Sequence, residues 1–313
     1  MTGERPFRFG VLAGPAAGID ALGRDARLAE ELGYSAFLLP DHLGHEWGPL
    51  VALAVVAQHT ERIAVGPLML AVDLRRPVVL YKELATLAQL APRRLEIGLG
   101  AGWYRDDFTR SGTPMDEALI RVQRLDEAAT ILRGLWSGSR FSYEGQHHSV
   151  VDAYGEPRPP APEATRWTLG GGGPRVLEVA VRHGDIVSVS ARMSSGGRDT
   201  SFGASATVAE FDRRIAWIRE LAGDRLGAIE LQTLAFATAV SNDSRRHAAR
   251  VLGPMFGLPP DDALASPLAL VGTVDEICER LLAHRARLGI SYWVIHAAKL
   301  TEFADVVAKL NGV

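Results

Sequence analysis

Short apolar runs alternate with longer amphipathic segments along most of the chain. Residues 7–14 (FRFGVLAG) predict a strand, and apolar residues spaced by three and four over 19–32 predict the helix that follows. The same alternation continues to a last predicted strand at 292–298 and a terminal helix. Strands rich in Val, Ile and Leu and separated by helices are typical of a parallel sheet that is buried on both faces.

The other predicted elements follow the same rhythm. Pro67 lies inside one predicted strand, so we expect that strand to bend there. Thr113 and Pro114 predict the start of a long helix, and Thr273 with Glu276 predicts a capping box. The further predicted strands are 35–42, 62–71, 93–102, 166–173, 185–191 and 229–240, and the further predicted helices include 49–60, 77–90, 174–183 and 207–222.

Eight strand–helix units in 313 residues predict a (β/α)8 TIM barrel of the α/β class, as one domain over 1–313. We expect insertions at about 137–164 and 192–206, in loops at the C-terminal face of the barrel. The competing fold is a doubly wound sheet, which carries its glycine fingerprint on the first strand–helix turn. Here the glycine run, residues 170–173, follows the fifth strand instead, which favours the barrel.

Composition narrows the classes of partner. A net charge of −3 argues against binding to nucleic acid or to an anionic membrane surface. The single cysteine, Cys278, and the lack of a membrane-length apolar run predict a cytoplasmic protein. His42, His45 and Glu46 are close in sequence, but no further ligand follows at a known spacing, so we expect no metal site.

Candidate chemistry gathers where the predicted strands end, because barrel active sites lie at that face. Asp41 and His42 follow the second strand, and adjacent side chains there point to opposite sides. His42 suits proton donation or acceptance near neutral pH, although a histidine at this place also caps loops. Gly100 and Gly102 flank Ala101 after the fourth strand and leave backbone open to a flat ring.

The glycine run after the fifth strand predicts a phosphate site. Successive backbone N–H groups can turn toward one anion, and the helix that begins near Pro174 adds the positive end of its dipole. Arg175 either pairs with the phosphate or projects into solvent, and Ser190 on the next strand can add a hydroxyl. The residues that we assign to this site are Gly171, Gly172, Gly173, Pro174, Arg175 and Ser190.

Several segments together resemble the bacterial luciferase-like family of flavin and deazaflavin enzymes, which are (β/α)8 barrels. The resemblance covers essentially the whole chain, in the segments LAEELGYSAFLLPDH, RIAVGPLML, RLEIGLGAGWYRDDF, LGGGGPRVLEVAVRHGD and LVGTVDEICERL. It implies that the Asp41–His42 pair lies by the ring of coenzyme F420, a 5-deazaflavin. It also implies that a non-prolyl cis peptide at or near Leu68–Met69 supports that ring, with Gly100, Ala101 and Gly102 along the ring and its ribityl chain.

The expected function is that of a coenzyme F420-dependent oxidoreductase, in which hydride passes between the deazaflavin C5 and a small organic substrate. His42 would be the catalytic residue. The alternatives are a two-component monooxygenase that uses reduced flavin mononucleotide (FMN) and oxygen, and a catalytically degenerate cofactor-binding barrel.

The substrate itself is open at this point. The family's sugar-phosphate dehydrogenases carry a glutamate where Ala101 stands, which puts that activity in doubt. We expect a substrate pocket near Trp47, Trp103 and Tyr104. The resemblance to this family also implies a homodimer.

Overall fold

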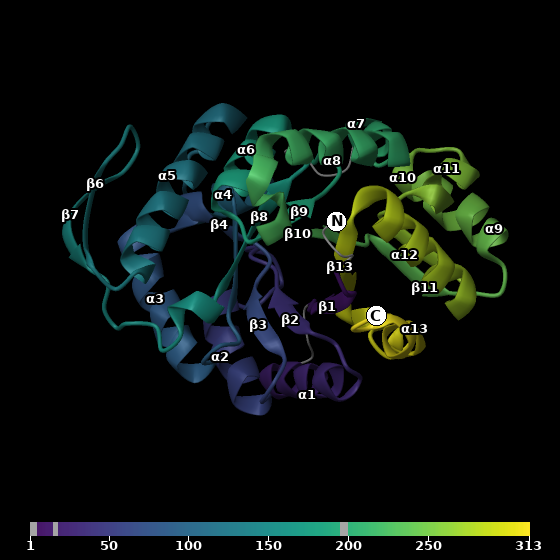
Figure 1. Ribbon diagram of the computed structural model, residues 1–313, viewed down its shortest axis with the longest axis horizontal. Helices are drawn as coiled ribbons and strands as arrows, with labels where there is room; N and C mark the ends of the chain where they lie inside the picture. The colour runs from purple at the N-terminus through teal and green to yellow at the C-terminus, as the bar shows by residue number, and fades with distance from the viewer. Residues whose placement is uncertain (1–4, 15–17, 195–199) are drawn as a thin grey trace.

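Eight strand positions form a parallel barrel in the computed structural model, which describes residues 5–14, 18–194 and 200–313. Residues 15–17 of the first predicted turn and 195–199 of the predicted 192–206 insertion lie outside the described residues. The sheet order is β3-β2-β1-β13-β10-β9-β8-β5-β4, and a bridge between Val65 and Leu95 closes the ring (Figure 1). The strands are β1 (Arg8–Leu12), β2 (Ala36–Leu39), β3 (Ala64–Pro67), β4 (Leu70–Ala71), β5 (Glu96–Gly100), β8 (Arg166–Gly171), β9 (Ile186–Val189), β10 (Glu230–Leu234) and β13 (Ile290–His296).

The third barrel strand is in two pieces, β3 and β4. The bend predicted from Pro67 is confirmed: β3 ends at that residue, and the Leu68–Met69 peptide that follows is cis, as the family resemblance implied. β3 pairs with β2, whereas β4 pairs with β5 beyond the break.

Helices cover the outside of the barrel, and most begin and end where the sequence predicts. They are α1 (Ile19–Glu31), α2 (Pro49–His59), α3 (Pro77–Leu90), α4 (Arg105–Ser111), α5 (Ala118–Trp136), α6 (Pro174–His183), α8 (Val208–Ala222), α12 (Val274–Leu288) and α13 (Ala304–Leu310). The capping box of Thr273 and Glu276 is confirmed. The predicted start at Thr113 is wrong: Gly112, in the left-handed region, ends α4 there, and α5 starts at Ala118.

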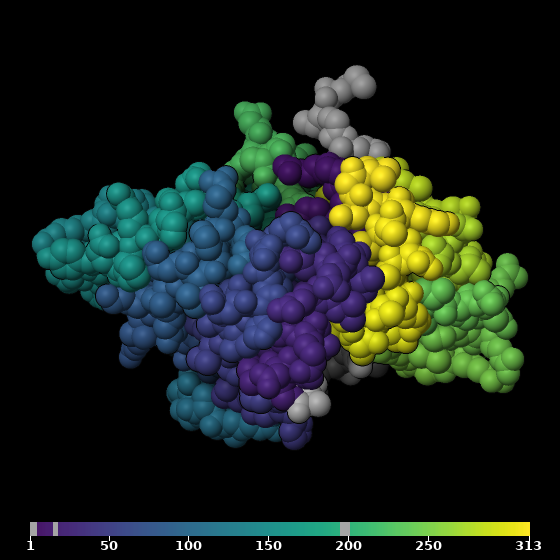
Figure 2. All heavy atoms as spheres, turned by 90° about the horizontal axis from the view of Figure 1, so that it is seen from below, coloured from purple at the N-terminus to yellow at the C-terminus, as the bar shows by residue number. Residues whose placement is uncertain are grey.

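The two chain ends lie side by side. The Phe7 backbone N–H donates to the Val313 carbonyl at 3.0 Å, and the Gly312 N–H donates back to the Phe7 carbonyl. Figure 2 shows the purple N-terminal elements against the yellow C-terminal helices. No helix among the described residues is long and apolar enough to cross a membrane.

The inner face of the barrel carries an apolar cluster and, at its N-terminal end, a charged one. Leu12, Leu38, Ile186 and Val294 form the apolar lining. At the N-terminal ends of the strands, Arg8 pairs with Glu96 and with Glu230, and the Tyr292 hydroxyl donates to Glu96 at 3.0 Å. We call Arg8, Glu96, Glu230 and Tyr292 the floor of the barrel.

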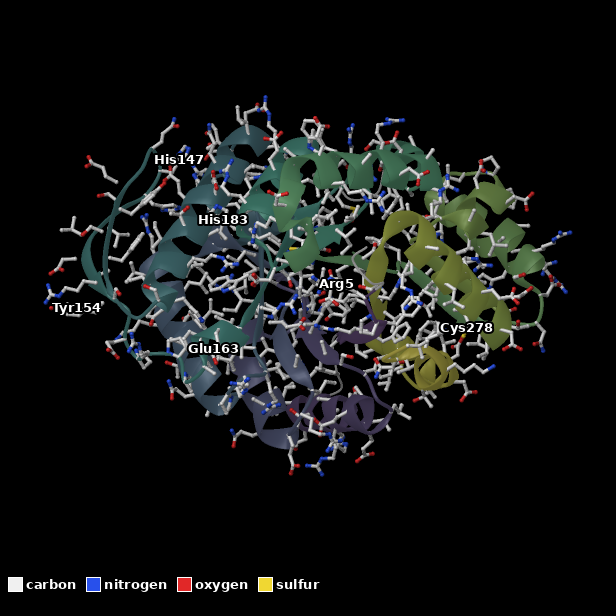
Figure 3. The ribbon with its side chains drawn as sticks, viewed as in Figure 1. Arg5, His147, Tyr154, Glu163, His183 and Cys278 are labelled. Carbon is white, nitrogen blue, oxygen red and sulfur yellow. The ribbon has the colours of Figure 1, made fainter. Side chains whose placement is uncertain are left out.

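The predicted insertion at 137–164 exists, but its predicted place at the C-terminal face is wrong. It connects the end of α5 to the start of β8, and helix-to-strand connections lie at the N-terminal ends of the strands. Its hairpin, β6 (Arg140–Glu144) with β7 (Ser149–Tyr154), packs on the outer side of α5, where Glu127 accepts the backbone N–H groups of residues 146–148. Figures 1 and 3 show the hairpin, with His147 and Tyr154, away from the barrel strands.

The predicted strand 229–240 splits into two. β10 ends at Leu234 inside the barrel, and β11 (Ala237–Val240) pairs outside it with β12 (Ala269–Gly272), a strand that the sequence pattern did not predict. Between them run α9 (Ser244–His247), a π-helical turn (Ala248–Leu252), α10 (Gly253–Phe256) and α11 (Pro260–Ala265). This excursion follows a strand end and therefore leaves the barrel at its C-terminal face. The 192–206 insertion leaves at the same face, after β9, and contains α7 (Thr200–Ser205).

Candidate active site

Asp41 follows β2 and braces the mouth, the C-terminal end of the barrel. Its carboxylate accepts two hydrogen bonds from the Arg75 guanidinium, at 2.6 and 2.7 Å, and a third from the Ala71 backbone N–H at 2.9 Å. Asp41 is buried, with 4% of its surface exposed. A bidentate arginine–carboxylate pair fixes geometry, so Asp41 holds β4 and the broken third strand in place against β2.

His42 points the other way and meets a second acid. Its Nδ1 lies 2.7 Å from Oδ2 of Asp107 on α4, and the other oxygen of Asp107 accepts the Leu43 backbone N–H at 2.8 Å. Asp107 is buried, whereas about a third of the His42 side chain is exposed. Because a carboxylate is an acceptor, it fixes the histidine tautomer with the proton on Nδ1 and leaves Nε2 as the available nitrogen.

Two aromatic rings stand edge-on to His42. The centroids of Trp103 and Tyr104 lie 5.8 and 5.9 Å from that of the imidazole. Gly102 takes φ = 70° just before them, and a Cβ there would meet the Phe108 ring at 2.8 Å. The structure therefore gathers Trp103 and Tyr104 at His42. The side chain of Trp47 is 37% exposed, and no contact between it and His42 is found.

A shelf of backbone lies beside this group, at the break in the third strand. A Cβ at Gly100 would lie 3.5 Å from the Cβ of Met69, so the two residues face each other at van der Waals distance. Leu68, Met69, Gly100 and Ala101 are all half-buried, which places them at the rim of the barrel rather than in its core. Leu68 and Met69 lie between β3 and β4, and Gly100 and Ala101 lie at the end of β5, so the four residues meet at the mouth.

The glycine run sits across the rim, at the junction of β8 and α6. The Gly171 carbonyl accepts the Ser190 N–H at 3.2 Å, and the Gly172 carbonyl accepts from Nε of Arg214 at 3.1 Å. In a trans peptide the N–H points opposite to the carbonyl, so the N–H groups of Gly172 and Gly173 point away from these partners. A Cβ at Gly173 would meet nothing within 4 Å, and α6 begins at the next residue.

Of the other residues assigned to the glycine-run site, two are exposed and one has its hydroxyl hydrogen-bonded. Pro174 and Arg175 are exposed in the first turn of α6, and the Ser190 hydroxyl donates to the Ala191 carbonyl at 3.2 Å. Arg214 of α8 was not predicted. It is buried, and burial lowers its pKa to about 10. A lone arginine in an amphipathic helix carries no sequence signal that distinguishes it from a surface residue.

Arg75 and Asp107 were likewise not assigned to the site from the sequence. Arg75 lies two residues before the proline that opens α3, and Asp107 lies in the first turn of α4. Asp107 is 65 residues from His42 along the chain. Among the described residues there is no group of three or more His, Cys, Asp or Glu side chains that could hold a metal ion.

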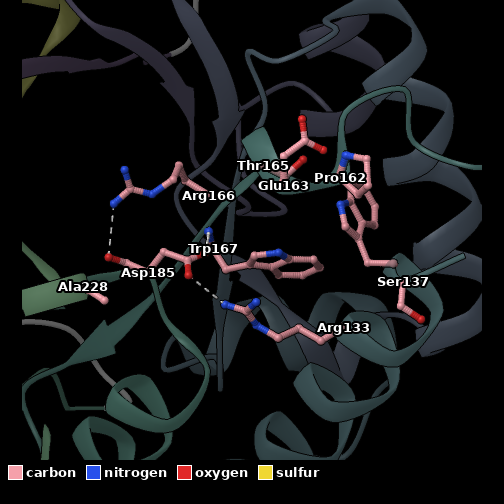
Figure 4. A pocket seen from close by; sticks show the side chains of 10 residues that line it. Arg133, Ser137, Pro162, Glu163, Thr165, Arg166, Trp167, Asp185 and Ala228 are labelled. Atoms are coloured by element: carbon pink, nitrogen blue, oxygen red, sulfur yellow. Dashed lines mark hydrogen bonds and ion pairs between the residues drawn. The ribbon is translucent and has the colours of Figure 1, made fainter. Parts of the chain in front are cut away.

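A separate pocket of about 350 Å³ lies at the other end of the barrel. Arg166 and Trp167 start β8, and Asp185 precedes β9, so this pocket belongs to the N-terminal ends of the strands (Figure 4). Asp185 accepts from Arg133 at 3.1 Å and from the Trp167 backbone N–H at 2.9 Å. None of the residues assigned to the site lines it.

Known proteins match this chain along most of its length. A family model described as luciferase-like monooxygenase matches residues 6–292. An F420-dependent glucose-6-phosphate dehydrogenase of Microbacterium testaceum is 36% identical over 188 residues, which cover 56% of this chain and 54% of that protein. The protein of the same name from Amycolatopsis mediterranei is 26% identical and covers 91% of this chain and 92% of that one. The chain spans about half the length of several of the curated relatives in the aligned regions.

Solved structures share the fold. The coenzyme F420-dependent tetrahydromethanopterin reductase from Methanopyrus kandleri superposes with a TM-score of 0.78 at 17% identity and covers 99% of both chains. An EDTA monooxygenase from Chelativorans gives the same TM-score at 16% identity, over 98% of this chain and 93% of that one. These likenesses confirm the predicted TIM barrel.

Proposed function

The chain belongs to the luciferase-like monooxygenase family, and from this premise we propose that it is a coenzyme F420-dependent oxidoreductase that transfers hydride between the deazaflavin C5 and a small organic substrate. The observation that carries the proposal is the His42–Asp107 pair, which stands at the barrel mouth beside the Met69–Gly100 shelf. The name of the curated relatives, F420-dependent, supports the choice of coenzyme.

The residues present fit such a coenzyme. The N–H groups of Gly172 and Gly173 point away from the partners of the preceding carbonyls, Gly173 has open space beside it, and a ten-residue helix begins at the next residue, which suits a phosphate. Leu68, Met69 and Gly100 would hold the ring at the shelf, with the ribityl chain between the two places. When bound, the coenzyme supplies a donor or acceptor of hydride at C5.

His42 moves the proton that accompanies the hydride. In the reduction of a carbonyl, its oxygen would take a proton from Nε2 of His42 in the form with both ring nitrogens protonated; in the oxidation of an alcohol, Nε2 of neutral His42 would accept the hydroxyl proton. Asp107 holds the ring orientation through Nδ1. Asp41 stays out of the chemistry, because Arg75 and the Ala71 N–H occupy its oxygens.

The substrate side of the mouth favours an uncharged molecule with a flat or apolar part. Trp103 and Tyr104 flank His42, and Ala101 offers no acid. We therefore propose a substrate other than the sugar phosphate named for the curated relatives.

Titration of the purified protein with both coenzymes tests the proposal. We expect micromolar binding of F420, followed by its fluorescence, with weaker binding of FMN. Micromolar FMN binding without F420 binding would overturn the choice of coenzyme and favour the two-component monooxygenase. Oxygen uptake by the protein loaded with reduced FMN would then identify that activity.

We further propose that the protein is a cytoplasmic homodimer of single barrel domains. Apolar side chains surround most of α2, and Val51 there and Val79 on α3 are 78% and 57% exposed. A second copy would cover this face. Light scattering on wild type and on Val51→Glu tests the assembly, and a monomeric wild type would contradict it.

A further inference from the structure

Gln232 on β10 carries a buried side-chain amide that makes no hydrogen bond to any residue that the structure describes. Its side chain is completely buried, and neither its amide nitrogen nor its amide oxygen has a hydrogen-bond partner among the described residues. A buried amide without partners destabilises a fold by about 1–3 kcal/mol relative to a satisfied one. An apolar residue of similar size would avoid this loss, so the position calls for a functional explanation.

Strand register places the amide inside the barrel. Gln232 pairs with Tyr292 on β13 and with Ser188 on β9, and Tyr292 reaches the floor on the inner face. Leu234 is two residues nearer the mouth on the same face and is half-buried there. Gln232 therefore lies one inward position below the mouth.

The groups around it do not use the amide. On the floor, Tyr292 donates to Glu96, and Arg8 pairs with Glu96 and Glu230. On the mouth side, Leu234 pairs with Val294 on the neighbouring strand β13, and both side chains are apolar. Gln232 is thus the first polar side chain on the inner face of β10 below the mouth.

We propose that Gln232 binds the imide edge of the cofactor ring. That edge presents a carbonyl next to an N–H, and a primary amide is its complement, since Nε2 donates to the carbonyl and Oε1 accepts from the N–H. A phosphate only accepts and an apolar substrate does neither, so each would leave part of the amide unpaired. The inference rests on the proposed function in one respect, that the cofactor is a flavin or a deazaflavin; both rings carry this edge.

Gln232→Met tests the proposal through two measurements that move in opposite directions. Methionine is apolar and close in shape, so the protein without cofactor should gain stability, with an unfolding midpoint about 2–4 °C higher. Binding of the cofactor should weaken at least about tenfold, measured by fluorescence titration. A variant that binds the cofactor as tightly as wild type would overturn the inference and assign the amide to internal water.

Thr233→Val is the matched control. Thr233 is the next residue on β10, equally buried, but its side chain faces outward and its hydroxyl donates to the Val189 carbonyl at 2.8 Å. This variant should lose stability and leave cofactor affinity within about twofold of wild type. Loss of affinity in both variants would show a general effect of disturbing β10 and would count against a contact by Gln232.

A cofactor methylated at the imide nitrogen completes the test. It should bind wild type more weakly than the parent cofactor and bind Gln232→Met with no further loss.

The outcomes distinguish the choice of coenzyme from the contact between Gln232 and the imide edge. If FMN binds in place of F420 and Gln232→Met weakens FMN, the choice of coenzyme fails and the imide contact stands. If F420 binds wild type and Gln232→Met alike, only the imide contact fails. A wild type that binds neither ring overturns both.

Discussion

The floor and the mouth of the barrel are built on the same strands and differ in how their polar groups are used. On the floor, the carboxylates of Glu96 and Glu230 share Arg8, and Tyr292 adds a hydroxyl. At the mouth, His42 keeps one ring nitrogen available, and the N–H groups of Gly172 and Gly173 point away from the partners of the neighbouring carbonyls. Paired groups hold shape, whereas unpaired groups are available to a ligand.

Electrostatics reinforce the contrast. Burial alone lowers the pKa of Arg8, but Glu96, Tyr292 and Glu230 raise it overall, so the guanidinium stays charged. Burial, and then Glu96, raises the pKa of Tyr292 well above its usual range, so the phenol stays neutral. The guanidinium of Arg8 and the phenol of Tyr292 therefore each keep one protonation state at physiological pH. We expect variants of the floor to change stability and variants of the mouth to change activity.

The largest expected effect is on activity, from His42→Ala. Loss of a positioned acid–base group should slow turnover about 10²–10⁴-fold, followed by the coenzyme absorbance with a substrate that the wild type accepts. The unfolding midpoint and coenzyme affinity should change little. His45→Ala, at an exposed position three residues on, is the control and should keep full activity. Wild-type turnover in His42→Ala would remove the mouth from the chemistry.

The next effect is on stability, from Arg8→Met. It leaves the buried carboxylate of Glu96 without its cation and that of Glu230 with Arg166 alone, and we expect a loss of about 3–5 kcal/mol in the free energy of unfolding, measured with denaturant. Coenzyme affinity should stay unchanged in the folded fraction. Arg93→Met breaks an ion pair with Glu163 in which both side chains are 69% exposed, and should lose less than about 1 kcal/mol. Equal losses in the two variants would contradict the role given to the floor.

A smaller effect on activity is expected from Asp107→Asn. The amide can donate to Nδ1 of His42 and favour the wrong tautomer, so turnover should fall about 10–100-fold with little change in coenzyme affinity. Asp106→Asn is the control, because Asp106 contacts Tyr104 and Arg110 rather than His42. A loss of stability without loss of turnover would show that Asp107 acts only through its hydrogen bond from the Leu43 backbone N–H.

The smallest effect, on acid sensitivity, should come from neither region. His284 of α12 packs on Trp293 outside the barrel, and burial, followed by Arg280 and Arg287, lowers its pKa to about 4. In the unfolded chain His284 takes up a proton near pH 6.5, whereas in the folded protein it stays neutral to a lower pH. The neutral, buried His284 therefore contributes stability that is complete above pH 6.5 and is lost as the pH falls toward 4. His284→Phe should remove roughly 2 kcal/mol of the stability difference between pH 7 and pH 5, measured by denaturant unfolding. An unchanged pH dependence would place the acid sensitivity elsewhere.

Much of the fold could be predicted from the sequence because its strands are short, apolar and separated by clear helices. The errors occurred where that contrast fades. Residues 229–240 contain no glycine or proline, so nothing in the pattern marks Leu234 as the last barrel residue. The face of the 137–164 insertion follows from connection order rather than composition, because a segment between a helix and the next strand lies at the N-terminal end.

The candidate site divides in the same way. Asp41, His42 and the glycine run could be found because they follow strand ends. Asp107 contacts His42 across 65 residues, and Arg214 reaches Gly172 across 42. Gln232 lies in an ordinary strand pattern, and only its burial without partners sets it apart. These residues are defined by packing between distant segments, which periodicity and local motifs do not report.

The two hydrogen bonds on the glycine run, from Ser190 and Arg214, have a thermodynamic consequence. Both carbonyls are tied before any anion arrives, so the loop loses little conformational entropy on binding. The association should therefore carry a small entropic penalty for a site with so many glycines, and calorimetry on Arg214→Lys should show that penalty grow.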